Sequence, residues 1–449
     1  MTTETNNLGN YNWKDRIPHY IKVDDLTEEQ KTRLMHSSHF CMLPWVHLHA
    51  WPDGTAYPCC LAKANHPVGN FKKDSMKTVW NDEPMRRLRR NMLADLPSPE
   101  CGDCYEQEAS GFASMRNNSN KGFGHHIHIV DETDPDGVFS SMDFKYWDVR
   151  FSNICNLKCR SCGSIFSSRW YDDDVKLWGK PLRARIQYAG QHALDIWEQM
   201  EPHLDSIEQI YFAGGEPLIM EEHNRILKTL IKRGRADKVR LIYNTNLTEL
   251  KWKRESVIGL WKHFRLVCVA ASLDDMGERA AVIRSGTDWP QVEQNIRDIK
   301  KECPHIDFMI SPTLSIMNIW RFIEYHRYMI EQGFIEPKDF NLNILQGPVH
   351  YRIDVLPLDI KLEFKKKFEE HIAWLQDKDP IHRAKGGFEA AINFMMAEDN
   401  SKHLPTFWEV TDELDRVRGE SLSSTVPELE RIMSYKRKVI PIQNEITTQ

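Results

Sequence analysis

The residues of this chain with the most evident chemistry are its cysteines. The sequence has 449 residues and ten cysteines, most of which fall between positions 41 and 162. Such clustering indicates metal ligation more than it indicates thiols scattered through a core. The two outlying cysteines are Cys268, in the apolar run LVCVAASL, and Cys303, which precedes Pro304. Both are expected to be ordinary small buried residues.

Three cysteines lie in one short loop, SNICNLKCRSC, in which Cys155, Cys159 and Cys162 have the spacing C-x3-C-x2-C. Three thiolates on so short a segment can hold three irons of a cubane [4Fe–4S] cluster and leave the fourth iron open. Thiolate is a soft ligand that favours iron–sulfur or zinc over hard cations. A structural zinc site would need a fourth protein ligand, and none is evident close to this loop.

A second group of cysteines lies upstream, beginning with CMLPWVHLHAWPDGTAYPCC at Cys41. A hairpin with PDG at its tip would bring Cys41 and Cys59 together. CGDC, at Cys101 and Cys104, follows an arginine-rich helical stretch. The spacing alone allows either an iron–sulfur cluster or a zinc site with four cysteine ligands. Cys60 competes with Cys59 for the ligand position, and the sequence does not decide between them.

Alternating strands and helices must position the first loop. Short apolar runs recur after about residue 142, with helical stretches such as Glu221–Arg233 and Pro290–Lys300 between them. This alternation predicts βα units, a parallel sheet and an α/β fold. Six units are enough for an open, partial (β/α)6 barrel of the TIM type, with ligands at the carboxyl ends of the strands. The six runs are 146–152, 207–215, 239–246, 266–274, 307–315 and 340–345.

The same pattern divides the chain into four segments. A polar and aromatic N-terminal stretch is expected to wrap the surface. A small domain held by a metal centre instead of a large core follows it, and the turn-rich DETDPDG at Asp131–Gly137 marks its end. The barrel comes next, and a helical extension, beginning with an amphipathic helix from Leu358 to about Gln376, completes the chain. The predicted limits are 1–40, 41–135, 136–350 and 351–449.

Composition excludes several classes of protein. Hydrophobic residues make up 41% and charged residues 28%, which is typical of a globular protein and not of a disordered or fibrous chain. The net charge of −6 gives no general attraction to nucleic acid or to an anionic membrane. No run approaches the roughly 18 apolar residues of a membrane span, and the N-terminus has no secretory signal. The expected location is therefore the cytoplasm, where disulfides are rare.

The cysteine loop, its place after the first strand, and GGEP at Gly214–Pro217 together resemble the radical S-adenosylmethionine (SAM) superfamily. The resemblance implies a [4Fe–4S] cluster whose open iron is chelated by SAM. It also implies reductive cleavage of SAM to a 5′-deoxyadenosyl radical, which abstracts hydrogen from a substrate. An external one-electron donor of the flavodoxin or ferredoxin type would be the redox partner.

The resemblance also assigns SAM contacts to residues at the ends of strands. Gly214 and Gly215 lack a Cβ, so their backbone would approach the methionine end of SAM, and Glu216 would accept from its amino group. Ordinary turn chemistry is the alternative for polar residues at strand ends. Contacts to the methionine carboxylate, the ribose or the pocket wall would come from Asn244, Asn246, Ser272, Asp274 and Arg284.

The upstream cysteines resemble a SPASM or twitch domain, with C-x12-G-x4-C, a GN turn, a helix with tryptophan, and C-x2-C. This resemblance implies a second, auxiliary [4Fe–4S] cluster held by Cys41, Cys59, Cys101 and Cys104. No cysteine occurs in EQEASGFASMR after CGDC, so the one-cluster twitch form fits better than the full SPASM form. Such modules usually follow the barrel, whereas this one precedes it.

The resulting hypothesis is a radical SAM enzyme of the oxidoreductase or peptide-modifying type. Twitch and SPASM relatives often act on polypeptides, so a peptide or protein side chain is the predicted substrate, and a small molecule stays open. The sequence assigns no catalytic acid or base. The other hypothesis is a zinc-stabilised binding protein whose barrel has lost catalysis. Histidines at His47, His49 and in HHIH (125–128) are expected to be surface or satisfied core residues instead of metal ligands.

Overall fold

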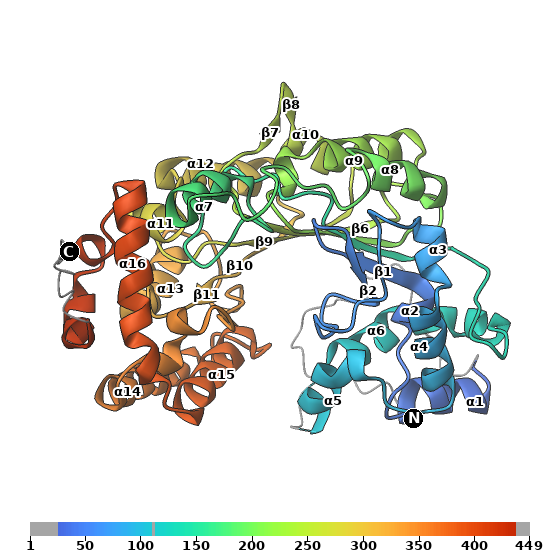
Figure 1. Ribbon diagram of the computed structural model, residues 1–449, viewed down its shortest axis with the longest axis horizontal. Coiled ribbons are helices and arrows are strands. Elements are labelled where there is room, and N and C mark those ends of the chain that lie inside the picture. Colours follow the sequence, from blue (N-terminus) through green and yellow to red (C-terminus); the bar gives the residue numbers. More distant parts are fainter. Residues whose placement is uncertain (1–25, 110–112, 437–449) are drawn as a thin grey trace, which may run out of the picture.

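The computed structural model describes residues 26–109 and 113–436 (Figure 1). Its centre is a mostly parallel sheet in the order β10-β9-β6-β5-β4-β1-β2-β3. The α/β class predicted from the sequence is therefore confirmed. The strands of this sheet are β1 (His47–Ala50), β2 (Thr55–Tyr57), β3 (Gly69–Asn70), β4 (Tyr146–Val149), β5 (Gln209–Phe212), β6 (Arg240–Thr245), β9 (Leu266–Ala271) and β10 (Asp307–Ile310).

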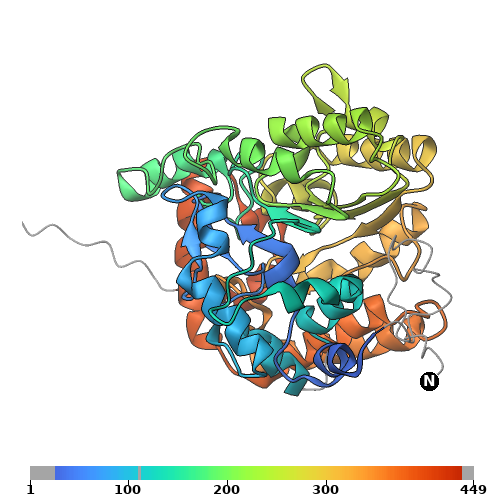
Figure 2. The same cartoon turned by 90° about the vertical axis from the view of Figure 1, so that its right-hand side faces the viewer.

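The strands β4, β5, β6, β9 and β10 coincide with the predicted apolar runs, and each neighbouring pair among them is parallel. The sixth run forms β12 (Asn343–Ile344), which pairs in parallel with β11 (Thr313–Leu314). A parallel bridge between Ile310 and Phe340 joins this small sheet to β10. The hairpin of β7 (Lys251–Trp252) and β8 (Glu255–Ser256) projects from the body in two perpendicular views (Figures 1 and 2).

Helices cover one face of the sheet because their apolar residues recur at helical spacing. In α12 (Trp289–Glu302), Asp288 caps the first turn and Pro290 occupies it, and Val292, Ile296 and Ile299 are buried. The predicted helix at 221–233 is α9 (Glu221–Lys232). The layer above the sheet in Figure 1 also contains α7 (Tyr171–Trp178), α8 (Asp195–Met200) and α10 (Val257–Trp261).

The other helices lie at the two flanks, below the sheet in Figure 1 or beside it. The N-terminal ones are α1 (Glu28–Lys31), α2 (Leu43–Val46), α3 (Met76–Trp80), α4 (Glu83–Leu93), α5 (Gly102–Ala109) and α6 (Met115–Phe123). The C-terminal ones are α11 (Gly277–Ile283), α13 (Phe322–Glu331), α14 (Leu358–Leu375), α15 (Arg383–Ala397), α16 (Leu404–Arg418) and α17 (Leu422–Thr425). The first part of the predicted surface wrap, residues 1–25, lies outside the described residues.

The cysteine-rich N-terminal region shares the central sheet. β1 pairs in parallel with β4, and β1 and β2 form the predicted antiparallel hairpin. Gly54 at its tip has φ of 88°, a conformation that favours glycine. The expectation that a metal centre replaces a large core here is wrong, because Trp45 and Trp80 are fully buried in a hydrophobic core that is continuous with that of the parallel strands.

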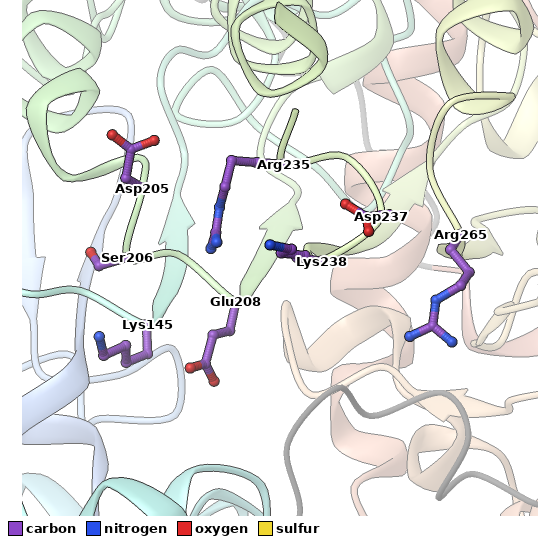
Figure 3. A pocket seen from close by; sticks show the side chains of 8 residues that line it. All are labelled: Lys145, Asp205, Ser206, Glu208, Arg235, Asp237, Lys238 and Arg265. Carbon is purple, nitrogen blue, oxygen red and sulfur yellow. The ribbon is translucent and has the colours of Figure 1, made fainter. Parts of the chain in front are cut away.

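A polar pocket of about 510 Å³ lies at the amino ends of the parallel strands (Figure 3). Lys145, Glu208, Lys238 and Arg265, which line it, each precede the first residues of a strand. This pocket is therefore at the opposite end of the strands from the cysteine loop. In the part of the chain described here, no helix combines the length and apolar composition needed to cross a bilayer.

Candidate functional site

The loop of Cys155, Cys159 and Cys162 follows β4 and is held by hydrogen bonds of its backbone to residues at the end of α11 and to the Trp170 side chain. Lys158 N donates to Ser285 O at 3.0 Å, and the neighbouring Arg160 N donates to Ile283 O at 2.9 Å. Trp170 Nε1 donates to Cys159 O at 3.0 Å. The loop therefore lies against the end of α11, at the carboxyl end of the strand.

The three thiols of the loop influence one another electrostatically. Burial is the main reason why the pKa of each is raised, and it brings the pKa of Cys162 to about 12. Cys159 raises the pKa of both Cys155 and Cys162 further. Thiols held in this way stay protonated near neutral pH, so a metal that binds them must displace their protons.

Arg284 reaches the cysteine loop from the end of α11. Its Nη1 lies 3.8 Å from Cys159 Sγ, and its Nε and Nη2 contact Asp274 at 2.8 and 3.0 Å. Burial alone would lower the pKa of Arg284, but Asp274 together with Cys159 and Cys162 outweighs burial, and the pKa is raised. Asp274 also accepts from Thr313 N at 2.8 Å. The carboxylate of Asp274 thus positions the guanidinium beside the thiols.

The GGEP turn packs directly on the cysteine loop. A Cβ at Gly215 would lie 2.1 Å from Ile154 O, and Glu216 N donates to the same oxygen at 2.7 Å. Gly214 has φ of 114°, which side chains rarely allow. Gly215 is therefore required for contact between the GGEP turn and the cysteine loop, and Gly214 is required for the backbone conformation of the turn. The sequence suggested only that this backbone approaches the methionine end of SAM.

The Glu216 side chain is buried and turned toward β6. Its carboxylate accepts from Thr245 Oγ1 and from Asn246 N, both at 2.7 Å, and from Leu218 N at 3.1 Å. Burial raises the pKa of Glu216 to about 7 although these donors oppose the shift. This carboxylate locks the turn after β5 to the end of β6, which is a different use from the predicted contact with the SAM amino group.

The other predicted contact residues gather at the same end of the sheet. Asn246 Nδ2 donates to Asn156 Oδ1 at 2.9 Å, and Ser272, just beyond β9, donates through its backbone to Thr245 O at 2.7 Å. Asn244 lies within β6, opposite Ala270. The sequence analysis did not identify Asn156, although its place inside the cysteine loop was a usable signal.

The four upstream cysteines come from three segments. Cys41 precedes α2, Cys59 follows β2, and Cys101 and Cys104 lie at or near the start of α5. Burial is the main cause of the raised pKa of Cys41 and Cys59, and the other cysteines of the group add to it. Arg116 lies close enough to lower the pKa of Cys41 and of Cys101 in part, a role that the sequence did not reveal.

Cys60 is oriented differently from its neighbour. Burial and then Asp148, on β4, raise its pKa to about 12, and it contacts the Asp148 carboxylate. Cys59 interacts with Cys60 and also with Cys41 and Cys101, whereas neither Cys41 nor Cys101 is among the main causes of the raised pKa of Cys60. The geometry thus favours Cys59 as the member of the four-cysteine group. Cys268 and Cys303 are buried, as expected of them.

The spacing of the sulfur atoms tests which metal group these residues fit. Tetrahedral zinc with Zn–S bonds of 2.3 Å places its sulfurs about 3.8 Å apart. No three cysteine sulfurs in the described chain lie within 4.8 Å of one another, although the thiols of each group interact electrostatically. The described sulfurs of both groups are therefore farther apart than a single tetrahedral zinc ion requires, and a cubane cluster separates its thiolates more widely than one zinc ion does.

Family comparison agrees with this chemistry. Residues 149–325 match the radical SAM superfamily, and residues 41–105 match SPASM, an iron–sulfur cluster-binding domain. These two segments belong to those families, with the SPASM domain on the N-terminal side of the radical SAM domain. A radical SAM domain implies a [4Fe–4S] cluster and SAM, and a SPASM domain implies auxiliary iron–sulfur binding. Nothing in the match supports the alternative of an inactive zinc-binding protein.

Solved structures with partial similarity include anSMEcpe with bound AdoMet, at 19% identity over 51% of this chain and 58% of that one, with a TM-score of 0.35. Streptococcus suis SuiB bound to S-adenosylmethionine has 11% identity over 62% of this chain and 59% of its own, with a TM-score of 0.33. TYW1 with a lysine–pyruvate adduct has 15% identity over 51% and 71%, with a TM-score of 0.27. This chain therefore spans less than two thirds of the length of anSMEcpe and of SuiB. A comparison with curated proteins found no match.

Proposed function

We propose that this chain is an iron–sulfur enzyme that cleaves SAM reductively and abstracts hydrogen from a peptide or protein side chain. The observation that carries the proposal is the convergence of Cys155, Cys159 and Cys162 with the Arg284 guanidinium at the carboxyl ends of the strands. Three thiols leave one iron of a cubane cluster without a protein ligand, and a guanidinium beside that position suits a carboxylate.

The chemistry that a cluster and SAM supply when bound is one-electron cleavage of the sulfonium to methionine and a 5′-deoxyadenosyl radical. The protein's part is to bind and orient. Arg284, held by Asp274, would take the methionine carboxylate. Because the Glu216 carboxylate is occupied within the protein, the GGEP turn would contribute its backbone near the methionine end. Asn246 and Ser272 would line the pocket.

The proposal includes an open, partial (β/α)6 barrel formed by the six parallel runs, with its mouth at the cysteine loop. Support comes from the face of the sheet turned away from α9 and α12. There, Cys268, Ala270 and Met309 form a small cluster of their own, separate from the main core. A face that the core does not fill is where a substrate could reach the radical.

Cys41, Cys59, Cys101 and Cys104 would hold the auxiliary cluster. Four thiolates leave no iron open for SAM, so this site would serve electron relay or substrate binding. A flavodoxin- or ferredoxin-like protein would deliver the electron. A reducing compartment such as the cytoplasm would keep the thiols available to iron.

The test begins with anaerobic purification, reconstitution with iron and sulfide, and metal analysis. The reduced enzyme is then incubated with SAM, with and without a library of candidate peptides, and 5′-deoxyadenosine is quantified. We expect iron and sulfide in both sites, slow SAM cleavage alone, and faster cleavage with a suitable peptide. Zinc in the cysteine sites without iron, or no 5′-deoxyadenosine from reduced protein, would overturn the proposal.

A further inference from the structure

Three ligand-type side chains meet where the SPASM segment joins the sheet of the radical SAM segment. His47 and His49 lie on β1, one residue apart, and Asp148 lies on β4 directly opposite His49. One ligand atom of each lies within 4.8 Å of the other two. All three side chains are almost completely buried, with exposures of 0%, 1% and 0%. The cluster is therefore closed to bulk solvent.

The hydrogen bonds of the two histidines leave their outer nitrogens unpaired. Nδ1 of His47 contacts Tyr146 O at 3.0 Å, and Nδ1 of His49 contacts Asp148 O at 2.8 Å. A carbonyl only accepts, so Nδ1 of each ring carries a proton, and in the neutral ring Nε2 carries the lone pair. Neither Nε2 has a hydrogen-bond partner among the described residues. The two histidines are core residues, as the sequence suggested, but the described chain satisfies only one ring nitrogen of each.

The Asp148 carboxylate is also poorly satisfied for a fully buried charge. Within the described chain neither oxygen accepts a hydrogen bond of good geometry from a nitrogen or oxygen donor. His49 Nδ1 lies 3.2 Å away, but its hydrogen bond goes to the backbone, and Arg150 Nε is 3.7 Å away. Buried polar atoms without partners are costly, and each such group calls for an explanation.

We propose that His47, His49 and Asp148 bind one divalent transition-metal ion, with zinc as the expected occupant. Two imidazoles and a carboxylate are a donor set that zinc accepts. Backbone carbonyls on Nδ1–H are the outer contacts that hold metal-binding histidines in the correct tautomer. With bonds of about 2.0 Å the ligand atoms would close to about 3.3 Å from one another.

The surroundings suit such an ion. The Cys60 thiol contacts Asp148 and is the nearest candidate for a fourth ligand. Asp148 and a Cys60 thiolate would together balance the charge of Zn²⁺, while Arg150 stays outside as a neighbouring cation.

A second cluster, of two histidines and a glutamate, allows a comparison within the same chain. His125 and His126 each direct Nε2 at Glu208, at 3.1 and 2.7 Å. Their outer nitrogens are thus engaged with the carboxylate, unlike those of His47 and His49. We assign no ion to this second cluster, and it supplies the matched control.

An ion at His47, His49 and Asp148 would have a structural effect. It would cross-link β1 of the SPASM segment to β4, from which the cysteine loop departs. In the sequence the upstream cysteines flank β1, and the cysteine loop follows β4. The inference is independent of SAM cleavage, because it rests on the unsatisfied polar atoms alone.

The experiment uses the full chain with its iron–sulfur sites reconstituted, dialysed against zinc buffered by a weak chelator. We expect about one zinc per chain, with iron unchanged. Zinc-edge X-ray absorption should show two imidazoles and no more than one sulfur. The variant His47→Gln/His49→Gln should retain less than a tenth of that zinc, whereas His125→Gln/His126→Gln should retain all of it.

Several results would overturn the site. Wild-type protein could take up no zinc, its zinc could show three or four sulfur ligands, or the folded His47→Gln/His49→Gln variant could keep its zinc. If this variant does not fold, the wild-type zinc content and absorption spectrum decide the matter alone. Chelation should also lower the thermal midpoint of the wild type but not that of Asp148→Asn.

Discussion

The two cysteine groups differ in how the chain assembles them. Cys155, Cys159 and Cys162 occupy one continuous loop at the end of β4, whereas the upstream four come from three separate segments. Each group has a nearby arginine, but the arginines are used differently. Arg116 contacts the backbone of Ser37 and Phe40 and the carboxylate of Glu108. Arg284 contacts Asp274 and directs its remaining nitrogen at a thiol.

This difference separates a closed site from an open one. At the upstream site the proposed four thiolate ligands would leave no iron open, and Arg116 is already engaged within the protein. At the loop, three thiolates would leave one iron of the cluster without a protein ligand. The Arg284 guanidinium lies beside the same thiols and would be free to bind an anionic group. Changes in the two groups should therefore have different consequences for SAM.

Replacing Cys155, Cys159 and Cys162 together with Ala should abolish 5′-deoxyadenosine formation. With clusters of equal size, about half of the iron should be lost. Iron analysis and product quantification by chromatography measure both effects. The variant Cys303→Ala is the control and should keep full iron and activity, since this thiol lies in the main core and belongs to neither group. SAM cleavage that persists in the triple variant would show that the open site lies elsewhere.

Cys59→Ala should disturb the upstream site while Cys60→Ala should not, although the two residues are adjacent. Cys59 interacts with Cys41 and Cys101, and Cys60 faces Asp148. We expect the Cys59→Ala variant to lose iron and product formation but to retain slow, uncoupled SAM cleavage. Circular dichroism must first show that it is folded. Equal iron loss in both variants would contradict the assignment of Cys59.

Much of this arrangement could be predicted from local patterns. The runs at 207–215 and 239–246 became β5 and β6, and the cysteine loop follows β4 as expected. Such patterns succeed because strand and helix periodicity are properties of neighbouring residues. The hairpin at Gly54 was likewise predictable, since its turn chemistry is local.

Contacts between distant segments could not be predicted in the same way. Nothing in the spacing of His47 and His49 indicates that β1 pairs with β4, so Asp148 was not expected beside them. The role of Gly215 was also hidden, because the obstacle to a side chain there is Ile154 O from another loop. Both depend on the register of long-range pairing, which a single sequence does not encode in any short pattern.

Arg284→Ala should weaken SAM binding about ten- to a hundredfold, because a charge-assisted hydrogen bond contributes roughly 1.5–3 kcal/mol. Arg284→Lys should recover only part of the loss, since an ammonium cannot contact Asp274 through two nitrogens and a ligand at once. Equilibrium binding of SAM to the reconstituted protein measures this. Arg279→Lys is the control, because Arg279 pairs with Glu428 and not with the thiols. Unchanged affinity in Arg284→Ala would assign the carboxylate to another residue.

Glu216→Gln should change how stability depends on pH. Burial raises the pKa of Glu216 from 4.5 to about 7, so the folded state holds this proton more tightly than the unfolded state does. The resulting stabilisation is complete below about pH 4.5 and is lost as the pH rises through about 7. Glutamine does not ionise, so the stability of the variant relative to the wild type should rise over this range by up to about 3 kcal/mol.

Anaerobic urea unfolding at pH 5, 6, 7 and 8 measures this relative stability in matched buffers. Glu221→Gln serves as the control, because Glu221 forms a surface ion pair with Arg225 instead of a buried contact. Parallel pH profiles for the wild type and Glu216→Gln would mean that the carboxylate stays ionised throughout. Its three donors from Thr245, Asn246 and Leu218 would then outweigh burial, and the GGEP turn would be held by a charge. A profile that is flatter in Glu216→Gln alone would show that burial dominates and that the turn is locked by a neutral acid at mildly acidic pH.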